Sequence, residues 1–218
     1  SPGVRLDFTA QNTGSIYLRL SDNNPTLAGP QVAYRLSVRR MQSESNNPGT
    51  PSKGVLVLLA GRLKNPDAVQ KNINAVTQAI YDLYKSNGYS DDDIQYLTTD
   101  PSMPGYDKPA TLANLQEAIV TWAKGKLTAD RQLTLYLMDH GDSEKFFVDG
   151  SIQPQQVLTP TLLGDWLGQI ESAVPGVKVT VIIEACYSGS FIKSVQRISK
   201  PGRLIIASTS ADTVAYAS

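Results

Sequence analysis

From about residue 54 onward, short apolar runs alternate with longer amphipathic segments, and this alternation constrains the fold of the chain most strongly. The apolar runs have the length of buried strands, and the segments between them carry apolar residues at helical spacing. Such an order of elements is typical of β-α units built around a mainly parallel sheet. The sequence therefore predicts an α/β domain over residues 54–218.

The boundaries of the expected elements follow from the same pattern. The first helix is expected to end at Asn87-Gly88, a pair that often terminates helices. A short apolar stretch around Asp149-Gly150 predicts a hairpin with these two residues as its turn. Strands are expected at 55–61, 94–98, 132–138, 177–183 and 203–207, helices at 66–86, 112–123 and about 161–172, and the hairpin at 146–152.

The residues before this domain follow a different pattern. Residues 15–20 and 32–38 alternate apolar and polar side chains, which predicts two strands. A polar stretch rich in proline, asparagine and serine follows and is typical of a linker. We therefore expect a β segment over residues 1–41, the end of a small β-domain, and a linker over residues 42–53. The stop soon after the last strand predicts a fragment that lacks the C-terminal end of the main domain.

The charge balance argues against several classes of partner. Twenty basic residues offset twenty acidic ones, and the sequence pI is about 6.5. Without a positive field the chain has little to attract phosphate backbones or acidic lipid surfaces, so neither nucleic acid nor a membrane is expected as a partner. No apolar run reaches the roughly 18 residues of a membrane helix, and the first residues lack the layout of a signal peptide.

The single cysteine and the single histidine limit the available chemistry. One cysteine cannot form an internal disulfide, and one histidine excludes a Cys/His zinc site of ordinary ligand number. The acidic run Asp91-Asp92-Asp93 lacks the spacing of an EF-hand and is interpreted as a solvated turn. We therefore expect no metal and no cofactor.

His140 and Cys186 each follow the end of a predicted strand. In an open parallel sheet the carboxyl ends of the strands border the ligand crevice, so both side chains are expected to open into it. A thiolate with a neighbouring imidazole suits acyl transfer, and the N–H groups of Gly141 and Cys186 are the expected oxyanion donors. Asp139 and Asp142 flank the histidine and could orient it or be solvated loop carboxylates.

The structural alternative is that Cys186 is a small buried hydrophobic residue, as lone cysteines usually are. Its placement together with His140, each after an apolar strand and each closely followed by glycine, favours catalysis. Glu184-Ala185-Cys186 is also close to the Gln-Ala-Cys signature of caspase-type enzymes, which have a histidine about 50 residues upstream. A flavodoxin-like binding module with a buried structural cysteine stays the alternative from another class.

Residues 182–190, together with Met138-Asp139-His140-Gly141, resemble the corresponding motifs of legumain-type peptidases and their bacterial caspase-like relatives. The resemblance covers roughly residues 54–218. It implies a caspase-like three-layer α/β/α fold and a cysteine endopeptidase that hydrolyses peptide bonds through a thioester. His140 and Cys186 match the catalytic residues of the family. An inactive or transpeptidating relative with the same site is a further alternative.

The resemblance also implies residues of a specificity pocket. Glu184 matches a residue that lines the pocket for the side chain before the scissile bond, and a loop with Asp212 and Val214 matches another wall. The Arg-His pair with which legumains bind asparagine falls on Asn72-Ile73, so asparaginyl specificity is not expected. An unpaired carboxylate of Glu184 or Asp212 would favour a basic side chain.

The two N-terminal strands resemble, more faintly, small β-domains that accompany secreted bacterial peptidases. This resemblance implies export or a place at the cell surface. The expected partner is a peptide or protein substrate, and the sequence leaves the oligomeric state open.

Overall fold

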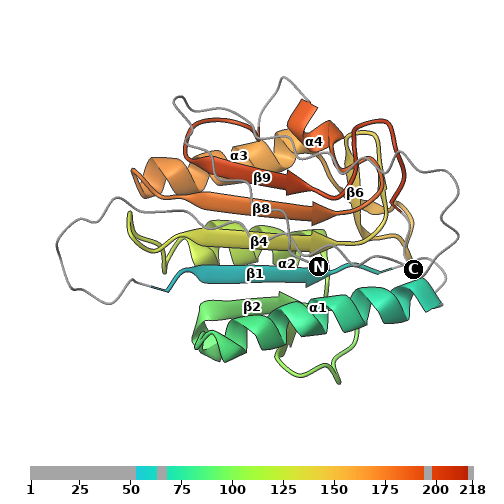
Figure 1. The fold of residues 1–218 in the computed structure, drawn as a ribbon, viewed down its shortest axis with the longest axis horizontal. Coiled ribbons are helices and arrows are strands. Elements are labelled where there is room, and N and C mark those ends of the chain that lie inside the picture. The colour runs from blue at the N-terminus through green and yellow to red at the C-terminus, as the bar shows by residue number, and fades with distance from the viewer. Residues whose placement is uncertain (1–52, 63–67, 194–197, 216–218) are drawn as a thin grey trace, which may run out of the picture. The chain divides into compact units, whose positions relative to one another are not determined.

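A six-stranded sheet is the centre of the computed structural model, which describes residues 53–62, 68–193 and 198–215 (Figure 1). The strand order is β3-β2-β1-β4-β8-β9, and each neighbouring pair is parallel. The predicted α/β fold with a mainly parallel sheet is confirmed. The strands are β1 (Val55–Ala60), β2 (Ile94–Leu97), β3 (Tyr106–Lys108), β4 (Leu133–Met138), β8 (Val179–Glu184) and β9 (Arg203–Ala207).

Helices cover both faces of this sheet, which gives the three layers of a caspase-like arrangement (Figure 1). On one face lies α1 (Ala68–Ser86), whose apolar side joins a cluster with the even-numbered residues of β1. The other face is covered by α2, its π-helical continuation η2, and α3. The bounds of the remaining helices are η1 (Asp91–Asp93), α2 (Leu112–Glu117), η2 (Ala118–Ala123), α3 (Pro160–Ala173) and α4 (Ser190–Lys193).

The burial of the strands explains their sequence patterns. All six residues of β1 are buried, because helices pack against both sides of this interior strand. In β8 buried residues alternate with half-buried ones, so the α1 face of the sheet is less completely covered at this strand. Glu184, the last residue of β8, lies on that half-buried side.

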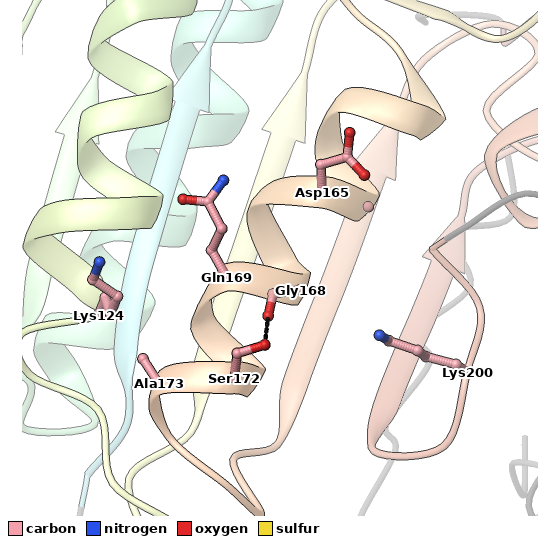
Figure 2. A pocket seen from close by; sticks show the side chains of 8 residues that line it. Lys124, Asp165, Gly168, Gln169, Ser172, Ala173 and Lys200 are labelled. Atoms are coloured by element: carbon pink, nitrogen blue, oxygen red, sulfur yellow. Dashed lines mark hydrogen bonds between the residues drawn. The ribbon is translucent and has the colours of Figure 1, made fainter.

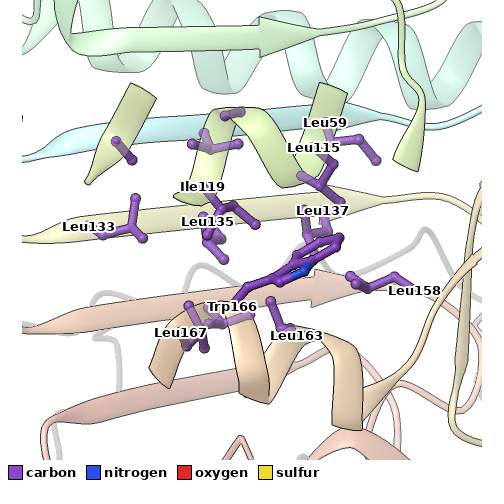
Figure 3. Close-up of a cluster of buried hydrophobic side chains, with 14 of the residues drawn as sticks. Leu59, Leu115, Ile119, Leu133, Leu135, Leu137, Leu158, Leu163, Trp166 and Leu167 are labelled. Atoms are coloured by element: carbon purple, nitrogen blue, oxygen red, sulfur yellow. The ribbon is translucent and has the colours of Figure 1, made fainter. Parts of the chain in front are cut away.

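The larger core cluster lies between the sheet, α2 and α3. Figure 3 shows the ring of Trp166 from α3 among Leu137, Leu158 and Leu163. Thr159 caps this helix, since its hydroxyl accepts a hydrogen bond from Leu162 N at 3.2 Å, and Pro160 occupies the first turn. The cap and the aromatic anchor fix α3 against the strands that carry the candidate site.

The hairpin predicted around Asp149-Gly150 is wrong in its turn. A small antiparallel sheet contains β5 (Gly141–Asp142), β6 (Lys145–Asp149) and β7 (Gln156–Leu158). The tight turn lies between β5 and β6, with Glu144 at a φ of 57°. The connection from β6 to β7 is a longer loop over residues 150–155, and Gly150 N donates to the carbonyl of Arg62 at 2.8 Å.

Other elements differ in smaller ways. The predicted helix over 112–123 is found, although its second half is π-helical. The short strand β3 was not predicted, because three residues that are at most half-buried give no alternating apolar pattern. The strands predicted at 15–20 and 32–38, and all but the last residue of the predicted linker, lie outside the described residues. In the described ranges, no helix is both long and apolar enough to cross a membrane.

Candidate active site

The segments with His140 and Cys186 leave the sheet side by side. Their strands, β4 and β8, are neighbours in register, with Met138 opposite Glu184. One further backbone hydrogen bond, from Asp139 N to the carbonyl of Glu184 at 3.2 Å, continues this pairing beyond the strand ends. Both residues therefore emerge at the carboxyl edge of the sheet, where parallel α/β folds place their crevices.

Gly141 brings the two segments into contact. A Cβ atom at this position would lie 2.3 Å from the carbonyl oxygen of Cys186 and 3.1 Å from Cβ of Ala185. Real Cβ atoms do not approach a backbone oxygen so closely, so only glycine fits without a shift of the backbone. The sequence singled out this glycine for its exposed N–H, and the structure adds a steric requirement.

The N–H of Gly141 is also turned away from the strand beside it. Phe147 N donates to the carbonyl of His140 at 3.0 Å, and Gly141 lies opposite Phe146. Hydrogen-bonded and non-hydrogen-bonded pairs alternate in an antiparallel ladder, so the pair of Gly141 and Phe146 is a non-hydrogen-bonded one. The pairing with β6 therefore leaves this donor available.

Cys186 is partly buried and lies against the segment that follows β9. Its Sγ accepts a hydrogen bond from Ala215 N at 3.3 Å and lies 3.8 Å from the carbonyl oxygen of the same residue. Tyr187, with a φ of 56°, turns the chain sharply after the cysteine and donates its N–H to Thr213 at 2.8 Å. The thiol is thus held at the surface by backbone contacts and is not part of the hydrophobic core.

A network of hydroxyl groups that the sequence did not reveal supports the cysteine segment. Ser188 Oγ accepts a hydrogen bond from Thr209 N, and Ser188 N donates to Thr209 Oγ1, both at 3.1 Å. Ser208 Oγ accepts a hydrogen bond from Ala185 N at 3.1 Å. Ser190 Oγ accepts one from Glu144 N at 2.8 Å. Ser188 and Ser190 are buried, and their position beside the cysteine was the available sequence signal.

His140 is exposed, and its backbone N–H donates to the Oδ1 atom of Asp139 at 2.6 Å. In the described part of the chain no hydrogen bond joins its imidazole to the thiol of Cys186. Hydrogen bonds between catalytic groups are often long or poorly aligned in unliganded enzymes and tighten when substrate binds. The structure thus places the two groups on adjoining connections without pairing them.

Asp139 is a buried carboxyl group and not a solvated one. Its Oδ2 atom has no partner within the described residues, and a Cβ atom on Gly61 would lie 2.0 Å from it. Burial, with a smaller contribution from the charge of Asp149, raises the pKa of Asp139 to about 8, although the hydrogen bond from His140 N opposes this shift. Asp142, in contrast, is exposed and pairs with Lys145 at 3.7 Å.

The predicted specificity residues lie in two places. Glu184 ends β8, and its Oε1 accepts a hydrogen bond from the Tyr136 hydroxyl at 3.5 Å. Burial raises the pKa of Glu184, an effect that this hydrogen bond partly offsets. Val214 and Asp212 are exposed on the segment that contacts the thiol through Ala215.

Ile73 and the wide hollow over α3 both lie apart from Cys186 and His140. Ile73, part of the pair matched to the asparagine-binding residues of legumains, is buried in the core under α1 and cannot line a pocket. This hollow has a volume of about 970 Å³. Figure 2 shows the side chains that line it, with Lys124 and Lys200 on its two sides. Both lysines precede the amino ends of strands, so this hollow lies away from Cys186. No cluster of potential metal ligands occurs among the described residues.

One comparison with known proteins gives a match over the part of the chain that contains this site. The model of the peptidase C13 family matches residues 113–218, which include His140, Gly141, Glu184 and Cys186. A search among curated proteins found no match. The C-terminal part of the chain is therefore similar to a family of cysteine peptidases, which supports cysteine-type peptidase activity and a peptide or protein substrate.

Proposed function

We propose that this protein is a cysteine endopeptidase in which Cys186 is the nucleophile and His140 is the general base and acid. One observation carries the proposal. The sole cysteine and the sole histidine of the chain lie on adjoining strand ends, and Gly141 packs directly on the backbone of Cys186. Cys186 is accessible, unlike the buried cysteine of a binding module.

The proposed reaction follows from these positions. His140 accepts the thiol proton, and the thiolate of Cys186 attacks the carbonyl carbon of the scissile bond. The N–H groups of Gly141 and Cys186 bind the oxyanion of the tetrahedral intermediate. His140 then protonates the departing amine, which leaves a thioester. A water molecule, deprotonated by His140, attacks this thioester, and the acid product and free thiol are released.

The segment after β9 supports the nucleophile in this mechanism. A hydrogen bond from Ala215 N to Sγ favours the thiolate over the thiol, because hydrogen bonds to a charged form stabilise that form. The same segment exposes Val214 beside the cysteine. It forms one wall of the proposed substrate site.

We further propose a basic side chain at P1, the residue before the scissile bond. Glu184 lies two residues before the nucleophile and has no ion pair among the described residues, where Tyr136 is its partner at 3.5 Å. A partly buried carboxylate without a cation is unfavourable, and an entering lysine or arginine would neutralise it. The exposed Asp212 is the less favoured candidate for this role.

Labelling of the native chain by peptidyl acyloxymethyl ketones that differ only at P1 tests the proposal. Rapid covalent modification of Cys186, detected by intact mass, is expected, and Cys186→Ala and His140→Ala should abolish it. Asp142→Asn is the control beside the histidine, since this exposed carboxylate is assigned no role, and it should label at the wild-type rate. Labelling that persists in His140→Ala would contradict the assigned base.

The same set of probes, which differ only at P1, tests the specificity pocket separately from the pair of His140 and Cys186. Glu184→Gln should slow labelling by basic probes roughly tenfold or more and leave apolar probes unaffected, because only the charge is removed. Asp212→Asn serves as the comparison. If basic probes label Glu184→Gln as fast as the wild type, Glu184 does not line the pocket, and the roles proposed for His140 and Cys186 are unaffected. Capture of the thioester by added amines in place of water would identify a transpeptidase.

A further inference from the structure

A second cleft opens at the carboxyl edge of the sheet, beyond β1, β2 and β3. It has a volume of about 320 Å³, enough for a small ligand. Strand β4 separates β1 from β8, and neither Cys186 nor His140 is among the residues that line the cleft. Its lining consists of Arg62, Asp149, four polar side chains (Thr98, Thr99, Tyr106 and Thr111) and three apolar residues (Pro101, Pro109 and Ala110).

Arg62 and Asp149 are held next to each other on one wall of this cleft. Their backbones form a parallel bridge, and hydrogen bonds from Arg62 N to Val148 and from Gly150 N to Arg62 flank it at 3.2 and 2.8 Å. Despite this proximity the two side chains form no ion pair in the described part of the chain. The wall therefore presents a cation and an anion that do not neutralise each other.

Only one of the two carboxylate oxygens of Asp149 accepts hydrogen bonds from the described residues. Its side chain is 7% exposed, and Oδ1 accepts hydrogen bonds from Ser151 N and Ser151 Oγ at 2.8 and 2.5 Å. Within the described ranges its second oxygen has no hydrogen-bond donor. This oxygen is not one of the fully buried, unpaired polar atoms of the described residues, so solvent reaches it and a ligand in the cleft could donate a hydrogen bond to it.

The remaining lining defines the rest of such a ligand. Pro101, Pro109 and Ala110 add apolar groups to the lining, and Thr99 adds a hydroxyl group. The matching molecule has an ammonium group for Asp149, a carboxylate for the exposed guanidinium of Arg62, and an apolar side chain. An α-amino acid has this combination, and its size suits the cleft.

We propose that this cleft binds a zwitterionic α-amino acid or dipeptide, with its ammonium on Asp149 and its carboxylate on Arg62. Binding involves no covalent step and does not depend on Cys186. The site is therefore separate from the proposed peptidase chemistry, and its test can succeed or fail independently of it.

Isothermal titration calorimetry of the full chain with L-leucine tests this proposal. Binding of leucine is expected, and N-acetyl-leucine and leucinamide should each bind roughly tenfold more weakly or worse, since each lacks one charge. Titration of Leu-Leu into Cys186→Ala, which cannot hydrolyse it, distinguishes a dipeptide site from an amino-acid site by which ligand binds more tightly. No heat of binding from either leucine or Leu-Leu would overturn the proposal.

Substitutions of the lining residues test whether leucine binds in this cleft. Arg62→Met and Asp149→Asn should each weaken leucine binding roughly tenfold or more. Lys124→Met, on the hollow over α3, should not change it. Arg62 is exposed, so its replacement leaves the fold intact even if Asp149→Asn, which alters a buried group, lowers stability. Wild-type affinity in Arg62→Met would place the ligand elsewhere and overturn the assignment.

Discussion

The space left by Gly61 is filled by the carboxyl group of Asp139, and this pair of residues makes stability depend on pH. The pKa of Asp139 is about 8 in the folded chain, above the ordinary value of 3.8. The folded state therefore holds its proton more tightly than the unfolded state between these values. Stability contributed by this group is complete below about pH 4 and is lost as the pH rises towards 8.

Asp139→Asn should remove this dependence, because the amide keeps an acceptor for His140 N and cannot ionise. We expect its free energy of unfolding, measured by urea titration at pH 5, 6.5 and 8, to fall less with pH than that of the wild type. Between pH 5 and pH 8, the free energy of unfolding should fall by a few kcal/mol at most more in the wild type than in Asp139→Asn. Asp142→Asn is the matched exposed control. Parallel pH profiles for Asp139→Asn and wild type would contradict the buried, protonated state of Asp139.

Gly141 is packed too closely against the cysteine segment to be replaced by a residue with a side chain without a shift of the backbone. A methyl group there would lie 2.3 Å from the carbonyl oxygen of Cys186, and the backbone must move to relieve the contact. Gly141→Ala should therefore reduce the rate of Cys186 labelling at least tenfold, since Gly141 N is a proposed oxyanion donor and displacement of such a donor is typically worth that much or more. Circular dichroism checks that the fold survives. An unchanged labelling rate would show that neither the close packing nor the donor matters.

Among the elements, α3 has room for a better helix former. A Cβ atom on Gly168 would meet nothing within 4 Å, and the glycine lies inside a 14-residue helix. Gly168→Ala should raise the free energy of unfolding by about 0.5 to 1 kcal/mol, because alanine loses less backbone entropy. Urea denaturation measures the change. A loss of stability would instead show that another group needs this space.

The elements also show which predictions a sequence can support. Strands and long helices were predicted well because periodic apolar residues record burial on one or both faces, as in β1 and α1. The turn at Ser143-Glu144 was missed because it contains no glycine and a glutamate adopts its positive φ, whereas Asp149-Gly150 gave a stronger but misleading signal. That pair is used instead for contacts with Ser151 and Arg62.

At the scale of the whole molecule, contacts between distant segments decide what the sequence could not show. The sequence placed His140 and Cys186 at strand ends, but only the strand order makes those strands neighbours. The burial of Asp139 depends on the missing side chain of Gly61, far away in sequence. The contacts of Ser188 with Thr209 are equally remote. Local patterns do not contain such information.

The strand order also has a kinetic consequence. β1 is the first of the described strands in the chain, yet it lies inside the sheet, and its partner β4 follows only after two further strands and α2. Parallel pairing across such long connections forms slowly. Until β4 and β8 have aligned, the histidine and the cysteine belong to separate flexible segments of a nascent polypeptide. A partly folded chain of this kind does not yet hold the two proposed catalytic groups together, so we expect the proposed peptidase activity to appear only when folding is complete.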